Sequence, residues 1–271
     1  MEEIMEEKDL KRVVKEKYGR IAEQSGEENS CCGGTSCCGP DTTYTVFSES
    51  YDKLEGYNPE ADLNLGCGIP TEFAGIMKGD HILDLGSGAG NDCFVARALV
   101  GAEGLVTGLD MTEPMVLKAR ENCRKLGYDN VEFVLGDIEA MPFDNDRFDV
   151  VISNCVLNLV PDKSKAFSEI FRVLKSGGHF CVSDVVIKGD LPEKLKKDAE
   201  MYAGCVSGAA DMKQYLNLIR ENGFTGVVIH KEKEIRMPEN ILSEYFDENE
   251  LRSFQADDSG IFSITVSAIK H

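Results

Sequence analysis

The sequence predicts an α/β fold, with a mostly parallel sheet that has helices on both faces. Short apolar runs that end in glycine or an acidic residue alternate with helix-like stretches between residues 81 and 187. Such alternation is typical of parallel strands connected by helices. The chain has 271 residues, of which 42% are hydrophobic, so it is long enough to bury the core that this fold needs.

Each element is predicted from its own residues. HILDLGSG (81–88) is an apolar run that ends in glycines, which indicates a buried strand followed by a turn. Gly127 is the expected C-terminal cap of the second helix, and two adjacent glycines are expected to end the third. The predicted strands cover 81–88, 104–110, 130–137, 148–154, 179–187, 226–235 and 261–270. The predicted core helices cover 91–100, 115–127, 164–178 and 212–224.

The chain divides into four predicted parts. A charged helix and a flexible cysteine-rich segment come first, and a segment that carries Cys67 leads into the core. An insertion that contains Cys205 follows the fifth strand. The parts are 1–40 for the N-terminal helix and cysteine segment, 41–78 for the cap segment, 79–190 for the cofactor-binding core, and 191–271 for the insertion and the end of the sheet.

The net charge of −19 bears on the partners of the protein. An excess of carboxylates repels phosphate backbones and anionic lipids, so neither nucleic acid nor a membrane surface is expected as a partner. The chain has no run of about 18 apolar residues that could span a membrane, and MEEIMEEKDL lacks the basic and apolar regions of a secretory signal. A cytoplasmic location is therefore expected, where cysteines stay reduced.

A glycine-rich loop follows the first predicted strand and precedes a helix, as in nucleotide-binding proteins. Because Gly86, Gly88 and Gly90 lack a Cβ, they let the backbone turn tightly and approach a ligand. Asn91 stands where the dinucleotide fingerprint has its last glycine. This difference makes an NAD-binding fold the weaker alternative.

Two acidic residues extend the pattern of the glycine loop. Asp110 ends the second strand, where a carboxylate can accept both hydroxyls of a ribose. Asp137 and the backbone of Ile138 follow the third strand and can reach an adenine edge. Together these features resemble the class I S-adenosylmethionine-dependent methyltransferases over about residues 79–190. The resemblance implies a Rossmann-like, mostly parallel seven-stranded sheet and S-adenosyl-L-methionine as the cofactor.

Three cysteines from distant parts of the chain are expected at the carboxyl edge of the sheet, where open α/β sheets bind ligands. Cys155 follows the fourth strand, Cys205 lies in the insertion and Cys67 precedes the first strand. Each could instead be a small buried hydrophobe. Soft thiolates select soft centres, and three of them suit arsenic(III), whose lone pair could attack a sulfonium methyl without a general base. The four histidines lie in or beside strands or at the chain end, which agrees with that chemistry.

A closer resemblance covers nearly the whole chain. LGCGIP, ILDLGSGAGNDCF, GLDMT, SNCVLNLVPDK, FRVLKSGGHFCVSDV and YAGCVSGA together resemble the arsenite methyltransferases, and VKEKYG (14–19) is similar to that family's N-terminal helix motif. The resemblance implies that Cys67, Cys155 and Cys205 hold arsenic(III), which is the substrate. It also implies that an N-terminal cysteine pairs with Cys67 while methylated arsenic is reduced again, and that thioredoxin or glutathione recharges the thiols.

The same resemblance implies a cofactor site. The glycine loop would frame the methionine part, Asp110 would bind the ribose and Asn154 would lie near the methyl group. The predicted set is Asp84, Gly86, Ser87, Gly88, Gly90, Asp110, Met111, Thr112, Asp137, Ile138, Glu139 and Asn154. The chain departs from the animal members at Asn64 and Leu65, where those members have tyrosines, and in its additional N-terminal cysteines.

The predicted function is methyl transfer from S-adenosyl-L-methionine to arsenite or its thiol conjugates. Two alternatives stay open: methylation of a small organic acceptor, with the cysteines only packed, and sequestration or sensing of arsenic. In CCGGTSCCGP (31–40), adjacent cysteines would chelate zinc poorly, which leaves a solvated thiol tail or a mobile redox partner for Cys67, and the glycines favour the redox partner. Our candidate for that partner is Cys32, with these alternatives: Cys31, Cys37 and Cys38.

Overall fold

The central sheet of this computed structural model contains the predicted strands and one short addition. The structure describes residues 7–24, 49–189, 208–235, 249 and 260–271. The strand order is β3-β2-β1-β4-β5-β8-β7, and the two-residue β6 (Ala210–Asp211) pairs with β5 off this path. Strands β1 to β5 run parallel, whereas β8 runs antiparallel to both β5 and β7. The predicted class of fold is confirmed.

The elements lie close to their predicted positions. The strands are β1 (His81–Leu85), β2 (Leu105–Asp110), β3 (Val131–Leu135), β4 (Phe148–Asn154), β5 (Leu174–Lys188), β7 (Thr225–Glu234) and β8 (Gly260–Ile269). The helices are α1 (Glu7–Gln24), α2 (Asn91–Val100), α3 (Glu113–Leu126), α4 (Lys163–Val173) and α7 (Met212–Glu221), with 3-10 turns at Pro70–Glu72 and Leu157–Leu159. Gly127 caps α3 in the left-handed conformation, as its position indicates.

The predicted end of the helix over 164–178 is wrong. Helix α4 ends at Val173 because Leu174 is extended, buried and paired with Phe148 of β4. Gly177, with φ of +80°, lies within β5 and beside a register shift between β4 and β5, so the glycine pair bends a strand and does not cap a helix.

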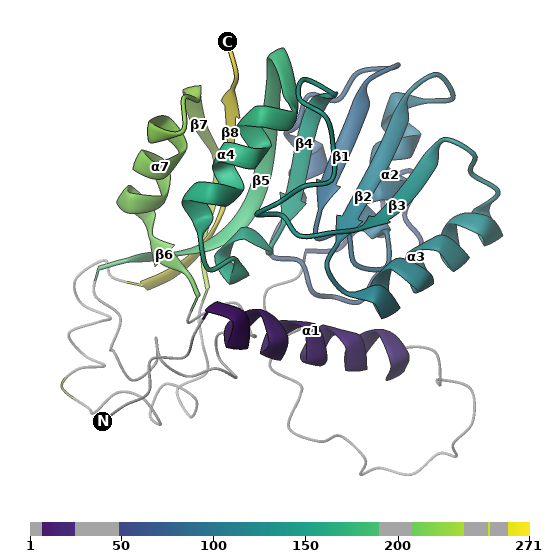
Figure 1. Cartoon of the computed structure of the whole chain (residues 1–271), viewed down its shortest axis with the longest axis horizontal. Helices are drawn as coiled ribbons and strands as arrows, with labels where there is room; N and C mark the ends of the chain where they lie inside the picture. Colours follow the sequence, from purple (N-terminus) through teal and green to yellow (C-terminus); the bar gives the residue numbers. More distant parts are fainter. Residues whose placement is uncertain (1–6, 25–48, 190–207, 236–248, 250–259) are drawn as a thin grey trace.

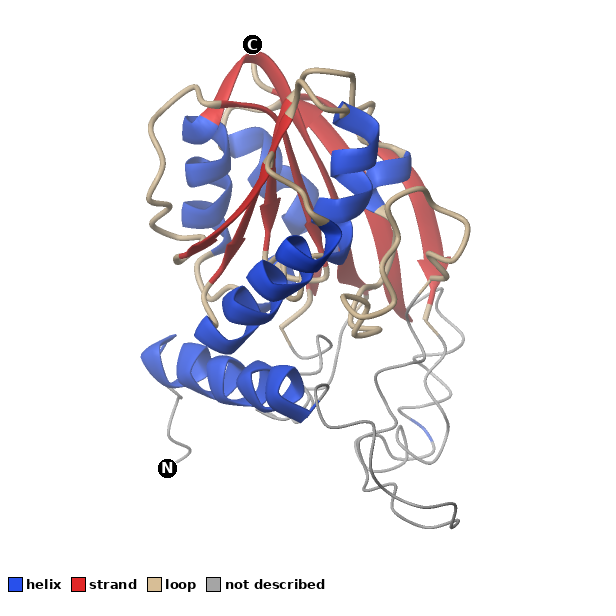
Figure 2. Ribbon diagram, turned by 90° about the vertical axis from the view of Figure 1, so that its right-hand side faces the viewer, coloured by secondary structure: helices blue, strands red, loops and turns tan. Residues whose placement is uncertain are grey.

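Two hydrophobic cores lie on opposite faces of the sheet, because successive strand residues point to opposite sides. Leu83 of β1 packs in a core with Phe167 of α4 and other residues of α4 and α7. Ile82, its neighbour in the strand, packs in a core with Phe94 of α2 and residues of α3. Figures 1 and 2 show these helices on the two sides of the sheet.

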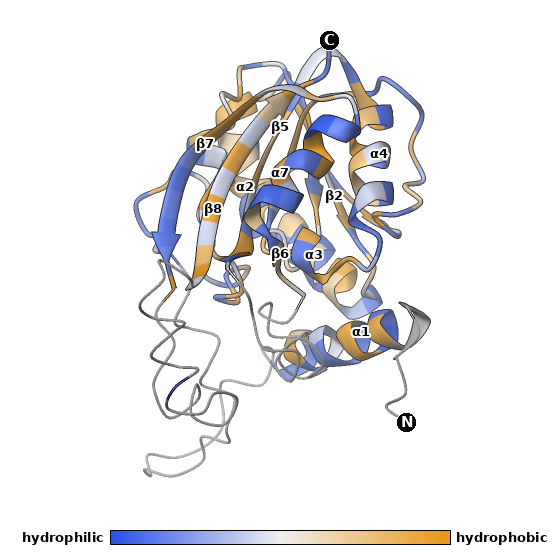
Figure 3. Cartoon of the chain, turned by 90° about the vertical axis from the view of Figure 1, so that its left-hand side faces the viewer, coloured by the Kyte–Doolittle hydropathy of each residue, from blue (hydrophilic) through white to orange (hydrophobic). Residues whose placement is uncertain are grey.

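Helix α1 covers the carboxyl ends of the strands and not a face of the sheet (Figure 1). It carries apolar and polar side chains (Figure 3), and its Val14 is buried. In the described part of the chain, none of the helices is long and apolar enough to cross a membrane. Much of 1–40 and 191–271 lies outside the described residues, so the division into four parts stays a prediction.

Candidate cofactor and thiol site

A cavity lies at the carboxyl edge of the sheet, between the loops that follow β1, β2, β3 and β4 and helix α1. The predicted cofactor-binding residues line this cavity, except Gly90 and Glu139. Apolar side chains after β4, such as Val156 and Leu159, complete one wall. The topology therefore brings the predicted site residues together.

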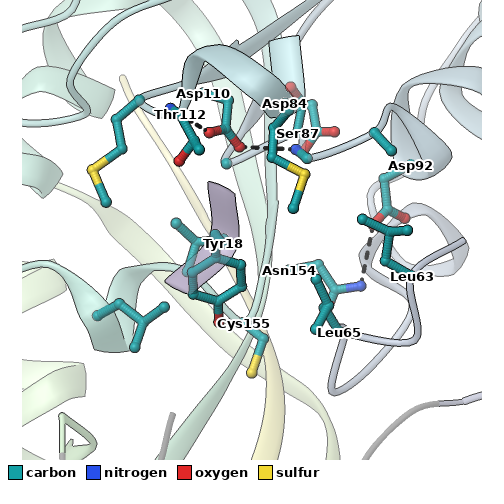
Figure 4. A pocket seen from close by; sticks show the side chains of 18 of the residues that line it. Tyr18, Leu63, Leu65, Asp84, Ser87, Asp92, Asp110, Thr112, Asn154 and Cys155 are labelled. Carbon is teal, nitrogen blue, oxygen red and sulfur yellow. Dashed lines mark hydrogen bonds between the residues drawn. The ribbon is translucent and has the colours of Figure 1, made fainter. Parts of the chain in front are cut away.

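Asp110 joins two of these loops. Its Oδ2 accepts the N–H of Gly88 at 3.0 Å, and its Oδ1 accepts the N–H of Thr112 at 2.8 Å (Figure 4). Burial raises the pKa of Asp110, while the hydrogen bonds from Thr112 and Gly88 oppose that rise. A carboxylate has about four acceptor sites, so this one can still accept hydrogen bonds from ribose hydroxyls.

The residues present fit S-adenosylmethionine. Gly88 has φ of +51°, and no heavy atom of the described chain lies within 4 Å of the place that a Cβ would take, so a ligand can approach its backbone. Ser87 Oγ and Asn91 Oδ1 are buried and lack a hydrogen-bond partner within the described structure. Buried polar atoms normally have partners, and the polar methionine end of the cofactor would supply them.

Gly90 and Glu139 shape the walls of the cavity. A Cβ on Gly90, which has φ of +100°, would lie 2.9 Å from the rings of Phe94 and Phe133. Glu139 accepts hydrogen bonds from Lys11 Nζ at 2.6 Å and from the N–H of Asp162 at 3.1 Å. Their contact with the cofactor itself stays a prediction.

Helix α1 contributes side chains that the sequence interpretation did not assign. Lys11, Val14 and Tyr18 line the cavity, and Lys11 Nζ lies 2.7 Å from Asp137 Oδ2. Burial disfavours the charge of Asp137, but hydrogen bonds from Lys11 and from the backbone of Glu139 hold its pKa below the usual value. The motif VKEKYG, which contains Tyr18, was the available sign that this helix belongs to the site.

The structure also brings the backbones of two predicted arsenic ligands together. Cys67 is buried, and its N–H donates to Asn154 Oδ1 at 3.0 Å. Cys155, the next residue after Asn154, lines the cavity with φ of +59°, a strained conformation for a residue with a side chain. Burial and the nearby Asp184, followed by Cys67 and Cys155, raise the pKa of Tyr215.

The other predicted thiols lie outside the described residues; they are Cys205, Cys31, Cys32, Cys37 and Cys38. The remaining described cysteines pack in the core, as expected, and these are Cys93, Cys123 and Cys181.

Two further residues of the cavity were missed in the sequence, Tyr51 and Asp92. Asp92 accepts hydrogen bonds from Tyr51 Oη at 2.8 Å and from Asn154 Nδ2 at 3.1 Å. Burial raises the pKa of Asp92 to about 6, against the effect of these two hydrogen bonds. An acid in the first turn after a glycine loop is a weak signal by itself, because acids often begin helices.

The chain matches known proteins over most of its length. A methyltransferase domain model matches residues 76–223. The arsenite methyltransferase of Halobacterium salinarum is 41% identical over 232 residues, which are 82% of this chain and 59% of that protein. The arsenite methyltransferase of Mus musculus is 40% identical over 228 residues, which are 80% of this chain and 58% of that protein. The chain thus spans about three fifths of the length of these relatives.

A solved structure extends the likeness to the fold. The arsenic(III) S-adenosylmethionine methyltransferase of Chlamydomonas reinhardtii has a TM-score of 0.64 and 38% identity, with 76% of this chain and 67% of that chain covered. The resemblance to the arsenite methyltransferases, the fold and the cofactor predicted from the sequence are confirmed. The chain therefore belongs to the S-adenosylmethionine-dependent methyltransferase family, with the class I fold and S-adenosyl-L-methionine as its cofactor.

Proposed function

We propose that this protein transfers a methyl group from S-adenosyl-L-methionine to trivalent arsenic, taken as arsenite or its thiol conjugates. The observation that carries the proposal is a pair of buried cysteines at the cofactor cavity. Cys155 lines the cavity, and the N–H of Cys67 donates a hydrogen bond to the side chain of Asn154, the residue before Cys155. Identity of 41% to the arsenite methyltransferase of Halobacterium salinarum supports the same substrate. The third proposed ligand is Cys205, from the segment after β5.

The three thiols would replace the three hydroxyls of arsenous acid. Each sulfur forms a bond to arsenic, and its proton leaves with the hydroxyl as water, so the buried site gains no net charge. The lone pair of arsenic is then the nucleophile, and it carries no proton that a base must remove. None of the four histidines, all of which lie in the described residues, lines the cavity. Their absence from the lining agrees with this chemistry.

On the donor side, the cofactor supplies a methyl group on a sulfonium sulfur, and that sulfur keeps the electron pair of the broken bond. We assign Asp110 to the ribose, Asp137 and Ile138 to the adenine, and Asp84 with the glycine loop to the methionine part. The apolar wall after β4 would exclude water from the transfer.

After the transfer arsenic is pentavalent, and two electrons must return it to the trivalent state. We propose that Cys32 and Cys67 supply these electrons. The Cys32 sulfur gives up its proton and joins the arsenic-bound sulfur of Cys67 in a disulfide, and the electron pair of the broken arsenic–sulfur bond stays on arsenic; the alternatives to Cys32 are Cys31, Cys37 and Cys38. Thioredoxin or glutathione would reduce the disulfide by thiol exchange. This cycle requires a reducing compartment, so we propose a cytoplasmic location.

The test measures S-adenosylhomocysteine formed by the purified protein with thiol reductant, with and without arsenite. We expect product only with arsenite. In Cys155→Ser we expect the rate to fall by at least about a hundredfold, as for a reacting-centre contact. In Cys123→Ser, whose thiol packs in α3 away from the cavity, we expect a rate near that of wild type. Product without arsenite would indicate an organic acceptor. Arsenite binding without product would indicate sequestration. Full activity of Cys155→Ser would contradict the proposed ligand set.

A further inference from the structure

Three polar side chains from distant segments meet behind the loop that carries Cys67. Tyr51 comes from the segment before β1, Asp92 from the first turn of α2 and Asn154 from the end of β4. Asn154 Nδ2 lies 2.8 Å from Tyr51 Oη and 3.1 Å from Asp92 Oδ2, and Tyr51 Oη lies 2.8 Å from Asp92 Oδ1. Figure 4 shows Asn154 directed at Asp92. The three side chains therefore form a closed triangle of hydrogen bonds, which we name the Asn154 triad.

The Asn154 triad holds the backbone on both sides of Cys67. Asn154 Oδ1 accepts the N–H of Cys67 at 3.0 Å, and its Nδ2 donates to the carbonyl of Gly68 at 2.8 Å. Tyr51 Oη lies 3.1 Å from the same carbonyl oxygen, which is a second acceptor beside Asp92 for its one hydrogen. The loop approaches so closely that a Cβ on Gly66 would lie 2.6 Å from Asn154 Nδ2. Cys67 is thus oriented by side chains that belong to other elements.

The same asparagine also precedes Cys155 in the chain. The N–H of Cys155 donates to the carbonyl of Ser183 at 2.8 Å, which fixes its backbone to β5. The side chain of Asn154 therefore reaches one cysteine loop while its main chain leads into the other.

Protein groups take up the hydrogen-bond donors of the Asn154 side-chain amide. An amide nitrogen has two hydrogens to donate, and Nδ2 already lies within hydrogen-bond distance of three acceptors. Asn154 lines the cavity, and its amide donors point at protein groups.

Charge and burial keep the triad in one arrangement. Tyr51 is 5% exposed, and burial together with Asp92 raises its pKa well above the usual value, so it stays a hydrogen-bond donor. Each oxygen of Asp92 accepts one hydrogen bond, from Tyr51 and from Asn154. Buried and satisfied networks of this kind specify a single geometry.

We propose that Tyr51, Asp92 and Asn154 are positioning residues that set the spacing of the Cys67 and Cys155 thiols for arsenic(III). The inference rests on the proposed function, because it takes these two thiols as ligands. Two thiols bind one arsenic only when both sulfurs can reach it at once, so a small displacement of the Cys67 loop weakens the second bond more than the first.

The test uses phenylarsine oxide, which takes two thiols, in a protein whose cysteines 31, 32, 37 and 38 are serine. Tyr51→Phe keeps the ring and removes the hydroxyl of the triad. We expect about tenfold weaker binding of phenylarsine oxide, the size of one lost buried hydrogen bond, and a smaller loss of affinity for S-adenosylhomocysteine. Tyr57→Phe is the matched control, because its ring stacks on Tyr51 at 6.4 Å and its hydroxyl bonds Asp62 instead.

Each outcome decides the matter. Unchanged phenylarsine oxide affinity in Tyr51→Phe overturns the inference, and so does an equal loss of both affinities, which would mean general loosening. Asp92→Asn, which keeps the side-chain volume, repeats the measurement should Tyr51→Phe be poorly folded. Cys67→Ser and Cys155→Ser distinguish failure of the proposed function from failure of the positioning role. If neither variant weakens binding of phenylarsine oxide, the proposed ligand set is wrong. If both variants weaken binding but Tyr51→Phe does not, only the positioning role is wrong.

Discussion

At the scale of a single residue, Asp110, our proposed ribose ligand, also joins two backbone segments of the site. Its two oxygens hold the glycine loop at Gly88 and the start of α3 at Thr112. A ribose that binds here meets an acceptor whose position is already determined by two backbone N–H groups. Such preorganisation lowers the cost of ordering on binding.

Asp110→Asn is expected to weaken S-adenosylhomocysteine binding by roughly ten- to a hundredfold, since a hydrogen bond to a charged group contributes about 1.5–3 kcal/mol. The amide keeps the size of the carboxylate but replaces one acceptor with a donor, which opposes either a backbone N–H or a ribose hydroxyl. Titration calorimetry measures the change, with the exposed Asp129→Asn as control. Equal affinities in the two variants would contradict the ribose role.

Site residues that belong to a local motif could be predicted, and those placed by long-range packing could not. Asp84 lies in β1, Gly88 follows β1 and Asp110 ends β2, all within a recognisable pattern, so their chemistry is visible in the sequence. Lys11 lies 126 residues from Asp137 in the chain. Tyr51 lies 41 residues from Asp92, and only the folded topology brings them together.

At the scale of an element, we expect the position of helix α1 to affect cofactor exchange. It lies across the carboxyl edge and lines the cavity with Val14 and Tyr18. Lys11 attaches it to Asp137 and Glu139, and the side chain of Glu139 is only 6% exposed. A cation at such a buried carboxylate is costly to remove.

Lys11→Met is expected to raise the rate of S-adenosylhomocysteine dissociation about five- to tenfold, because α1 loses its ion pairs while the apolar stem is kept. Arg12→Met is the matched control, since Arg12 is 66% exposed and pairs with Glu16 on the outer side of the same helix. Release of radiolabelled ligand after dilution gives both rates. If Lys11→Met and Arg12→Met release ligand equally fast, α1 does not limit exchange through this contact.

The strands were more predictable than the helix ends, for a physical reason. Apolar runs such as that of β1 are buried from both faces, and their composition alone marks them. The end of α4 depends on pairing of Leu174 with Phe148, a contact between strands that no local glycine signal reveals.

At the scale of the whole molecule, stability depends on carboxylates buried between elements. Asp184 of β5 is fully buried, and it accepts hydrogen bonds from Tyr215 of α7 at 3.0 Å and from the N–H of Val185 at 3.0 Å. Burial raises its pKa to about 6, although Lys163 acts in the opposite direction. The native state thus binds this proton at a higher pH than the unfolded chain does.

Between about pH 4 and pH 6 the native protein therefore holds more protons at Asp184, and this group's contribution to the unfolding free energy falls as pH rises. We compare the unfolding free energy of wild type with that of Asp184→Asn. We expect the difference, wild type minus variant, to fall by about 3 kcal/mol over this window, because the pKa of Asp184 is raised by roughly two units. Urea unfolding at pH 4, 5, 6 and 7 measures this difference. A difference that stays constant with pH would show that Asp184 does not titrate as its burial implies.

The strand order has a consequence for how methyltransferases of this kind diversify. Most residues that we propose for the methyl donor lie at the ends of β3, β2 and β1, while Cys155, a proposed arsenic ligand, follows β4 on the other side of β1. On this proposal, donor and acceptor specificity would reside in different parts of one sheet and meet between β1 and β4. A lineage or a designer could then exchange the nucleophile through residues after β4 and retain the source of the methyl group.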